Sequence, residues 1–249
     1  MFRVGIVAAL EREISGFLRG CVRVTREHEG RSFVFFECGE IVAVCGGIGA
    51  EPSRRAAEAL VALDRPSLLL SVGFAGALQP RLKIGDVLVP SVVVDARDGS
   101  RSAVTGGDGT TLITFMEVAG LAQKANLARA YGAQIVDMEA AAVAAAARAH
   151  GIEFRAVKAV SDDSSFEMPQ MEQFVEPDGS FKTAGFALHT ALRPWRWGRI
   201  LRLGRNSRKA SRALSAYLTR LRVEGSPATA AISSSGEAAV THAAGGGRG

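Results

Sequence analysis

The chain has 249 residues, 47% of them hydrophobic, and a formal net charge of +5 at pH 7. This composition is sufficient to bury one large core and excludes an intrinsically disordered protein. Three cysteines without CxxC or His-rich spacing indicate neither a disulfide framework nor a zinc site, and no uncharged apolar run reaches the roughly 18 residues of a membrane span. We therefore expect a cytoplasmic protein without a bound metal.

Strand-like and helix-like segments alternate along the chain. In the first half we predict a strand at 2–9, a helix at 10–18, a hairpin at 32–37 and 40–45, a helix at 51–63 and a strand at 67–72. In the second half we predict a strand after the turn at 84–86, a strand at 111–114, a loop at 115–124, a strand at 133–136, a helix at 139–149 and a strand at 152–160. This alternation predicts an α/β domain built on a central sheet.

Two acidic segments, 136–139 and 160–162, coincide with the ends of predicted strands of this sheet. The helix between them would return the chain to the same sheet edge, and the carboxyl ends of parallel strands face one crevice. Glu139 and Asp162 are therefore candidates for a shared pocket. Each also has a plainer interpretation, in which Asp162 caps a helix and Glu139 is a charge in a first helical turn.

The glycine-rich turn at 46–49 does not indicate a nucleotide cofactor. A G-x-G-x-x-G motif would need glycine where Pro52 stands, and no Walker lysine follows the turn. The G-x-S-x-G motif of serine hydrolases is also absent from the sequence. We expect no organic cofactor.

Charge is distributed unevenly along the chain. Residues 187–223 contain nine arginines, one lysine and no acidic residue, whereas residues 1–186 carry a net charge of −4. We predict a catalytic body at 1–186, a basic amphipathic helical segment at 187–223 and a disordered tail at 224–249. Apolar residues interleaved with arginine across 193–222 are typical of a helix at a membrane surface, and equally of a helix packed on the body with a solvated basic face. No nucleic-acid-binding module accompanies the segment.

Six short motifs occur in the order of one known family. They are VGIVAALERE at 4–13, GIG at 47–49, GFAG at 73–76, LKIGDV at 82–87, DMEA at 137–140 and AVSD at 159–162. Together they resemble the purine nucleoside phosphorylase and nucleosidase superfamily, nearest to the methylthioadenosine and S-adenosylhomocysteine nucleosidases. The resemblance implies a three-layer αβα fold with a central mixed sheet, a homo-oligomer, and an enzyme that releases adenine from an adenosyl nucleoside without a cofactor.

The resemblance also implies roles for single residues. Asp162 matches the acid that faces purine N7, Glu139 matches the acceptor of hydrogen bonds from the ribose hydroxyls, and Glu13 matches the residue that activates the attacking water. Phe74 or Phe115 would stack on adenine, although both are explained equally well as core aromatics. The other binding residues implied by the motifs are Ala75, Gly76, Asp137, Met138 and Ser161.

The resemblance favours hydrolysis over phosphorolysis. Ser71 stands where phosphorylases of this family carry an arginine, and Phe74 stands where they carry a serine. Glu11 and Glu13 lie where a phosphate would need positive charge. Arg12, beside these acids, makes phosphorolysis of a purine nucleoside the closest alternative. A non-catalytic adenosyl-binding protein is a third interpretation.

Two departures from the nucleosidases bear on the substrate. The stretch at 89–111 is shorter than in the methylthioadenosine enzymes, which implies that the roof over the 5′ side is missing and that the pocket is wide open. The basic segment, placed after 176–180, resembles the hopanoid-associated branch of the superfamily, whose implied substrate is adenosylhopane. A lipid-linked adenosyl substrate and peripheral contact with the inner face of the membrane would explain both features.

Overall fold

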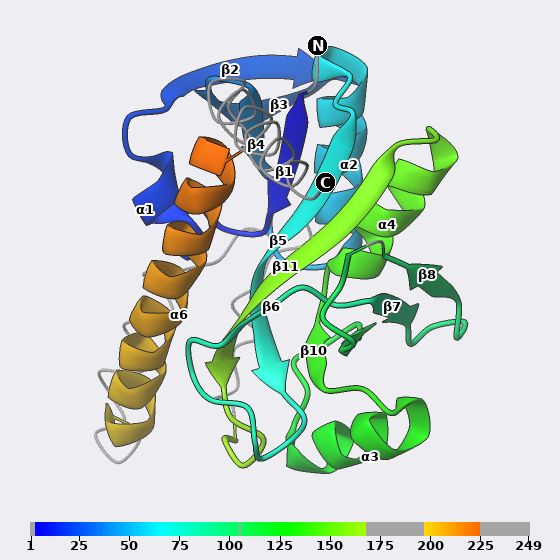
Figure 1. The fold of residues 1–249 in the computed structure, drawn as a ribbon, viewed down its shortest axis with the longest axis vertical. Coiled ribbons are helices and arrows are strands. Elements are labelled where there is room, and N and C mark those ends of the chain that lie inside the picture. The colour runs from blue at the N-terminus through cyan, green and yellow to red at the C-terminus, as the bar shows by residue number, and fades with distance from the viewer. Residues whose placement is uncertain (1–2, 105, 168–196, 225–249) are drawn as a thin grey trace, which may run out of the picture.

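A mixed sheet of eleven strands forms the centre of the part of the protein that the computed structural model describes, residues 3–104, 106–167 and 197–224 (Figure 1). The strands are β1 Val4–Ala8, β2 Val22–His28, β3 Arg31–Cys38, β4 Ile41–Cys45, β5 Leu68–Ala77, β6 Val87–Leu88, β7 Val92–Asp95, β8 Arg101–Ala103, β9 Thr111–Thr114, β10 Ile135–Asp137 and β11 Glu153–Asp162. The helices are η1 Glu11–Glu13, α1 Ser15–Leu18, α2 Ala50–Asp64, α3 Leu121–Tyr131, α4 Ala140–Ala149 and α6 Trp197–Glu224.

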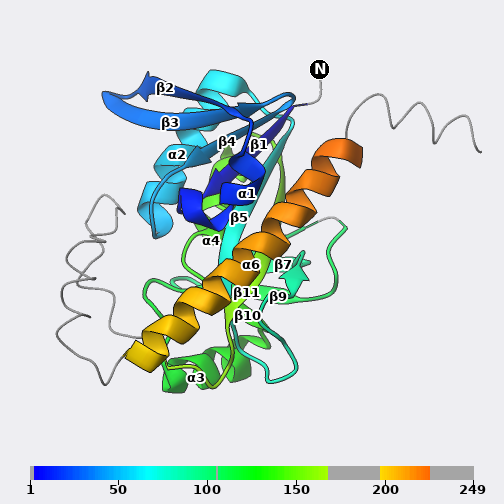
Figure 2. The same ribbon diagram turned by 90° about the vertical axis from the view of Figure 1, so that its left-hand side faces the viewer.

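Helices cover both faces of the sheet, so the predicted three-layer αβα arrangement is confirmed. Consecutive residues of a strand point to opposite faces, and Ile6 and Val7 of β1 accordingly belong to different apolar clusters. Ile6 packs in the cluster that contains residues of α1 and α6, whereas Val7 packs in the cluster that contains residues of α2 and α4. Figures 1 and 2 show α6 crossing the sheet on the face opposite α2 and α4.

Helix α6 is held on the body by an apolar stripe. Ala210, Leu214 and Leu218 recur at four-residue spacing and are fully buried in the cluster that α6 shares with β1 and β5. Arginines such as Arg205 and Arg220 are exposed. The described part of the basic segment therefore has the packed-helix arrangement with a solvated basic face. None of the helices described is long and apolar enough to cross a membrane.

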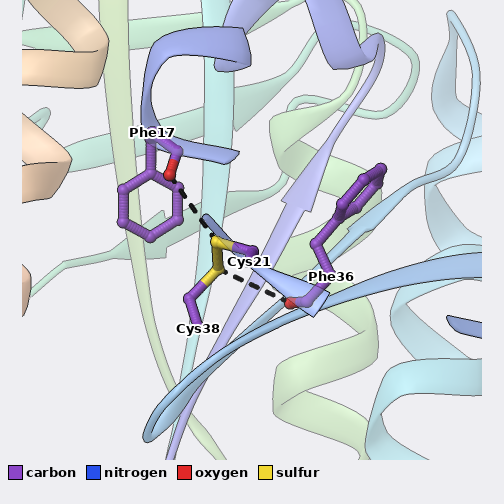
Figure 3. The surroundings of a disulfide bond; sticks show 4 residues. All are labelled: Phe17, Cys21, Phe36 and Cys38. Atoms are coloured by element: carbon purple, nitrogen blue, oxygen red, sulfur yellow. Dashed lines mark hydrogen bonds between the residues drawn. A yellow bond between two sulfur atoms is a disulfide. The ribbon is translucent and has the colours of Figure 1, made fainter. Parts of the chain in front are cut away.

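A disulfide bond joins Cys21 and Cys38, contrary to the expectation from the cysteine count (Figure 3). Strand β2 was not predicted, and its antiparallel pairing with β3 is what brings the two cysteines together. The register of this pair sets Val22 opposite Glu37, so the next position along places Cys21 opposite Cys38. The bond closes the open end of the β2–β3 hairpin beside Phe17. Such a crosslink stabilises the fold because it lowers the conformational entropy of the unfolded chain.

Other segments also differ from the predictions, and strands β7 and β8 lie between residues 89 and 111, where no strand was predicted. The helix predicted at 10–18 is divided into η1 and α1 by Ile14, whose φ of −119° and ψ of 18° are not helical. Helix α3 begins at Leu121, inside the predicted loop at 115–124. The other predicted elements are present, with β5 five residues longer at its carboxyl end than the predicted strand. Residues 168–186 at the end of the predicted catalytic body, 187–196 of the predicted basic segment and 225–249 of the predicted tail lie outside the described residues.

Candidate active site

A cavity of ≈ 920 Å³ lies where β1, β5, β10 and β11 end, beneath α6. Small-molecule sites in proteins span roughly 300–1,000 Å³, so this cavity has room for a nucleoside with a large substituent. Nine of the ten site residues proposed from the sequence line it, namely Glu13, Phe74, Ala75, Gly76, Asp137, Met138, Glu139, Ser161 and Asp162.

Phe115 is the exception among the proposed residues. It does not line the cavity, and it packs instead on the apolar cluster that contains Ile113, Leu127 and Val136. Its backbone N–H donates to the carbonyl oxygen of Asp137 at 2.8 Å, which fixes it beside β10. Phe115 thus packs against a core cluster, and Phe74 is the one of the two phenylalanines that lines the cavity.

The carboxyl ends of β10 and β11 meet at the same glycine of β5, but not as parallel strands. Val136 of β10 pairs with Gly76 in an antiparallel ladder, and Asp162 of β11 pairs with Gly76 in a parallel one. The prediction of a parallel pair was thus wrong, although the predicted convergence is present. A Cβ on residue 76 would lie 2.9 Å from Asp162 Oδ2 and 3.3 Å from Val136 Cγ1, so a larger residue there would displace the Asp162 carboxylate.

Asp162 is buried at the end of β11 and has protein donors on both carboxylate oxygens. The hydroxyl of Ser161 donates to Oδ1 at 2.8 Å, and the ammonium of Lys124 donates to Oδ2 at 2.5 Å. A β-bulge between Val160 and Asp162 re-aims the strand end toward the cavity. Lys124 comes from the first turn of α3, in a segment for which the sequence predicts a loop.

Glu139 is held by backbone N–H groups at the start of α4. Its Oε1 accepts a hydrogen bond of 2.8 Å from Gly49, and its Oε2 accepts one of 3.2 Å from Met138. Gly49 precedes α2 with φ of +102°, a conformation that favours glycine, which explains the glycine turn without a nucleotide. Burial and then the nearby Asp137 raise the pKa of Glu139 to about 7.

Glu13 is buried beneath the cavity at the end of η1, and its Oε2 has no hydrogen-bond partner among the described residues. Burial and then the charge of Glu139 raise the pKa of Glu13 to about 8. A Cβ on Gly73 would lie 2.8 Å from this oxygen, so the glycine leaves the carboxyl its place. A buried polar atom without a partner is uncommon in proteins and points to a ligand or water that completes the site.

Asp137 and Lys158 form a buried ion pair under these acids, with 2.8 Å between Oδ2 and Nζ. Asp137 also accepts hydrogen bonds from the hydroxyl of Thr114 and the backbone N–H of Ala140, so the protein occupies both of its oxygens. Burial opposes the charge of Lys158, but Asp137 and then Glu139 outweigh it and raise the pKa of Lys158. This network supports the start of α4. Asp137 was proposed from its motif, whereas Lys158, a lysine within the apolar strand β11, was not proposed from the sequence.

Helix α6 forms a roof over the cavity, so the prediction of an uncovered pocket was wrong. On this side the cavity is lined by small residues of α6, namely Gly204, Ser207, Ser211 and Ser215. The buried stripe of Ala210, Leu214 and Leu218 lies beside them and faces the core. The sequence predicts contact of the basic segment with a membrane or with solvent and does not indicate its place over the site. Two of its arginines, Arg208 and Arg212, also line the cavity.

Comparison with known proteins identifies the family. The profile described as "Phosphorylase superfamily" matches residues 3–120 and 107–185. The chain belongs to the phosphorylase superfamily. Within this superfamily, it is 36% identical over 89 residues to the 5′-methylthioadenosine/S-adenosylhomocysteine nucleosidase of Treponema pallidum (strain Nichols), and the aligned segment is 34% of this chain and 33% of the relative. The chain thus matches about a third of that curated relative's length.

Solved structures share the fold of this phosphorylase-superfamily chain. Arabidopsis thaliana 5′-methylthioadenosine nucleosidase in apo form has a TM-score of 0.68 at 19% identity, over 88% of this chain and 94% of that chain. Helicobacter pylori 5′-methylthioadenosine/S-adenosyl homocysteine nucleosidase, solved with a bound pyrrolidine compound, has a TM-score of 0.62 at 18% identity, over 88% and 98% of the two chains. The resemblance drawn from the six motifs is confirmed at the level of family and fold.

Proposed function

We propose that this protein hydrolyses the N-glycosidic bond of an adenosyl nucleoside and releases adenine. The observation that carries the proposal is that three buried carboxylates with different environments share one cavity. Asp162 is paired with a cation, Glu139 is held by backbone N–H groups, and Glu13 has an oxygen without a partner. The nucleosidase names of the relatives support the same reaction.

Each carboxylate suits a different step of the reaction. Asp162 donates a proton to the purine as the bond to the sugar breaks, and the bonding electrons move into the base. Glu139 accepts hydrogen bonds from the ribose hydroxyls, with Met138 against the sugar. Glu13 accepts a proton from the water whose oxygen attacks C1′. Phe74 provides the aromatic face for stacking on the base.

Phosphorolysis is the second candidate, because Arg12, Arg208 and Arg212 line the same cavity and guanidinium groups bind phosphate well. A phosphate beside Glu13 and Glu139 would, however, meet two carboxylates, which favours water. Incubation of the protein with methylthioadenosine, with and without phosphate, followed by mass spectrometry of the products, separates the candidates. We expect adenine and the free thioribose in both reactions. A sugar 1-phosphate would establish phosphorolysis, and the absence of free adenine would favour a non-catalytic binding protein.

We further propose that the 5′ substituent of the substrate extends beneath α6. The cavity follows this helix from Leu203 to Thr219, about 24 Å at the helical rise, and small side chains leave room along it. A lipid-linked adenosyl group, such as adenosylhopane, has the required length. Exposed arginines on the outer face of α6, together with Leu201 at 67% exposure, support peripheral contact with an anionic membrane surface. The homo-oligomer stays a prediction.

The length of the 5′ substituent can be tested with two substrates that differ only in their alkyl chain. We expect kcat/KM for 5′-octylthioadenosine to exceed that for methylthioadenosine by about tenfold or more, because each buried CH₂ contributes about 0.8 kcal/mol of binding. Adenine release measured at low substrate concentration gives both values. Equal values would show that the alkyl chain gains no contacts beneath α6, and a lower value for 5′-octylthioadenosine would restrict the site to short 5′ groups. Either result would leave the proposed reaction intact.

A further inference from the structure

Lys124, near the start of α3, occupies a position that neither helix formation nor solvation explains. It lies in the first turn of the helix, where its backbone N–H donates to the carbonyl of Gly120, and only 2% of the residue is exposed. The amino end of a helix carries partial positive charge, so a cation there is disfavoured. Burial of an ammonium adds a further cost. A compensating partner is therefore required.

That partner is Asp162, the proposed acid of the reaction. The Nζ atom of Lys124 lies 2.5 Å from Asp162 Oδ2 and donates also to the carbonyl oxygens of Asp163 at 2.8 Å and Phe166 at 3.4 Å. An ammonium has three protons, and these contacts use all of them. Lys124 thus has no donor left for a substrate, and any effect on the reaction must pass through Asp162.

Stability alone does not explain the pair. A buried ion pair is often no more stabilising than apolar residues of the same volume, because both charges lose their hydration. Here both members also line the cavity, so the aspartate is held at a surface that a ligand reaches. The pair therefore fixes one carboxylate oxygen and leaves Oδ1, which contacts Ser161, as the oxygen from which a proton can leave.

We propose that Lys124 is a positioning residue that orients Asp162 and stabilises the carboxylate formed when Asp162 gives its proton to the departing purine. This inference rests on the proposed function. The proton passes from Asp162 to the base while the electrons of the glycosidic bond move into the purine. Water supplies the hydroxyl to C1′ and its proton to Glu13. After the products leave, Glu13 releases that proton to solvent, and Asp162 takes up a proton when the next substrate binds. The ammonium of Lys124 keeps its own protons throughout.

Two substrates that differ in their need for acid catalysis test this role. Methylthioadenosine has a leaving group that must be protonated, whereas the nitrophenolate of 4-nitrophenyl β-D-riboside leaves without a proton. We expect Lys124→Met to lower kcat for methylthioadenosine by about a hundredfold, the size of a general-acid effect, and to change kcat for the nitrophenyl riboside by less than about threefold. Lys124→Arg should recover part of the loss, because it restores the positive charge.

The control is Lys83→Met, which removes an exposed lysine of the loop before β6 and should leave both rates unchanged. Equal losses on the two substrates, or no loss on either, would overturn the inference and make Lys124 a purely structural residue. If Lys124→Met does not fold, Lys124→Gln, which keeps a neutral donor, takes its place in the same comparison. Failure of the wild-type protein to release adenine would instead overturn the proposed function, so the two results are distinguishable.

Discussion

Replacement of Asp162 by asparagine should lower kcat for adenine release from methylthioadenosine by at least about a hundredfold, the loss expected for a general acid. The amide has nearly the same shape as the carboxyl but cannot give a proton to the purine. The purine would then have to leave as an anion inside a buried cavity. Initial rates of adenine formation, measured at saturating substrate, check the prediction.

Two comparisons make the Asp162→Asn result specific. Asp98→Asn changes an exposed turn between β7 and β8 and should retain full activity. Asp162→Asn also leaves the ammonium of Lys124 buried without its counter-charge, which costs stability. The double variant Asp162→Asn with Lys124→Met removes that unpaired charge, and it should be more stable in thermal unfolding while remaining inactive. Activity within about tenfold of the wild type in either variant would show that Asp162 is not the acid.

Replacement of Glu13 by glutamine should likewise lower kcat by at least about a hundredfold. It should also remove the rise of kcat/KM with pH that the wild type shows below about pH 8. Glu13 accepts a proton only when it is ionised, and its pKa is raised to about 8. In the wild type, kcat/KM should therefore rise with pH up to about 8, because the ionised fraction falls about tenfold for each pH unit below that value. Steady-state rates between pH 6 and 9 are the measurement.

Glu11→Gln is the matched control for this variant, because Glu11 belongs to the same short helix but has an exposed side chain that does not line the cavity. It should retain the wild-type rate and the wild-type pH profile. If Glu13→Gln kept the rise in kcat/KM toward pH 8, a different group would have to be the base.

Glu13→Gln should also make the folded protein more stable at pH 8. Folding raises the pKa of Glu13 from 4.5 to about 8. Between these two pH values the folded chain therefore holds a proton that the unfolded chain has lost. Stability therefore falls as pH rises through this window, and glutamine removes that loss. Lower activity with a higher melting temperature at pH 8 is the signature of a residue kept for function.

The buried strands and the long helices could be predicted from local pattern. Strand β1 reads as a continuous apolar run, and helix α2 is marked by Pro52 in its first turn and a periodic apolar face. The same pattern placed β10, α4 and β11 in order and so brought Glu139 and Asp162 into view. Glu13 was found by its motif, since nothing in the spacing of a short acidic segment indicates that it is buried.

The missed features are all contacts between segments far apart in the sequence. Cys21 and Cys38 become partners only through the β2–β3 register, and α3 delivers Lys124 to a strand end 38 residues away in the chain. The sequence around Phe115 is compatible with stacking on a base and with packing in a core, and only the structure shows that it packs against a core cluster.

The sequence by itself determined the alternating α/β pattern, the family and the identity of most acidic residues at the cavity, because strand and helix periodicity and short motifs are local properties of the chain. Only the tertiary structure decided the direction in which β10 approaches Gly76, the position of α6 above the cavity, and the donors that each carboxylate receives. These features depend on which distant surfaces meet. The chemical character of Glu13, Glu139 and Asp162 follows from burial and partners, which the fold supplies.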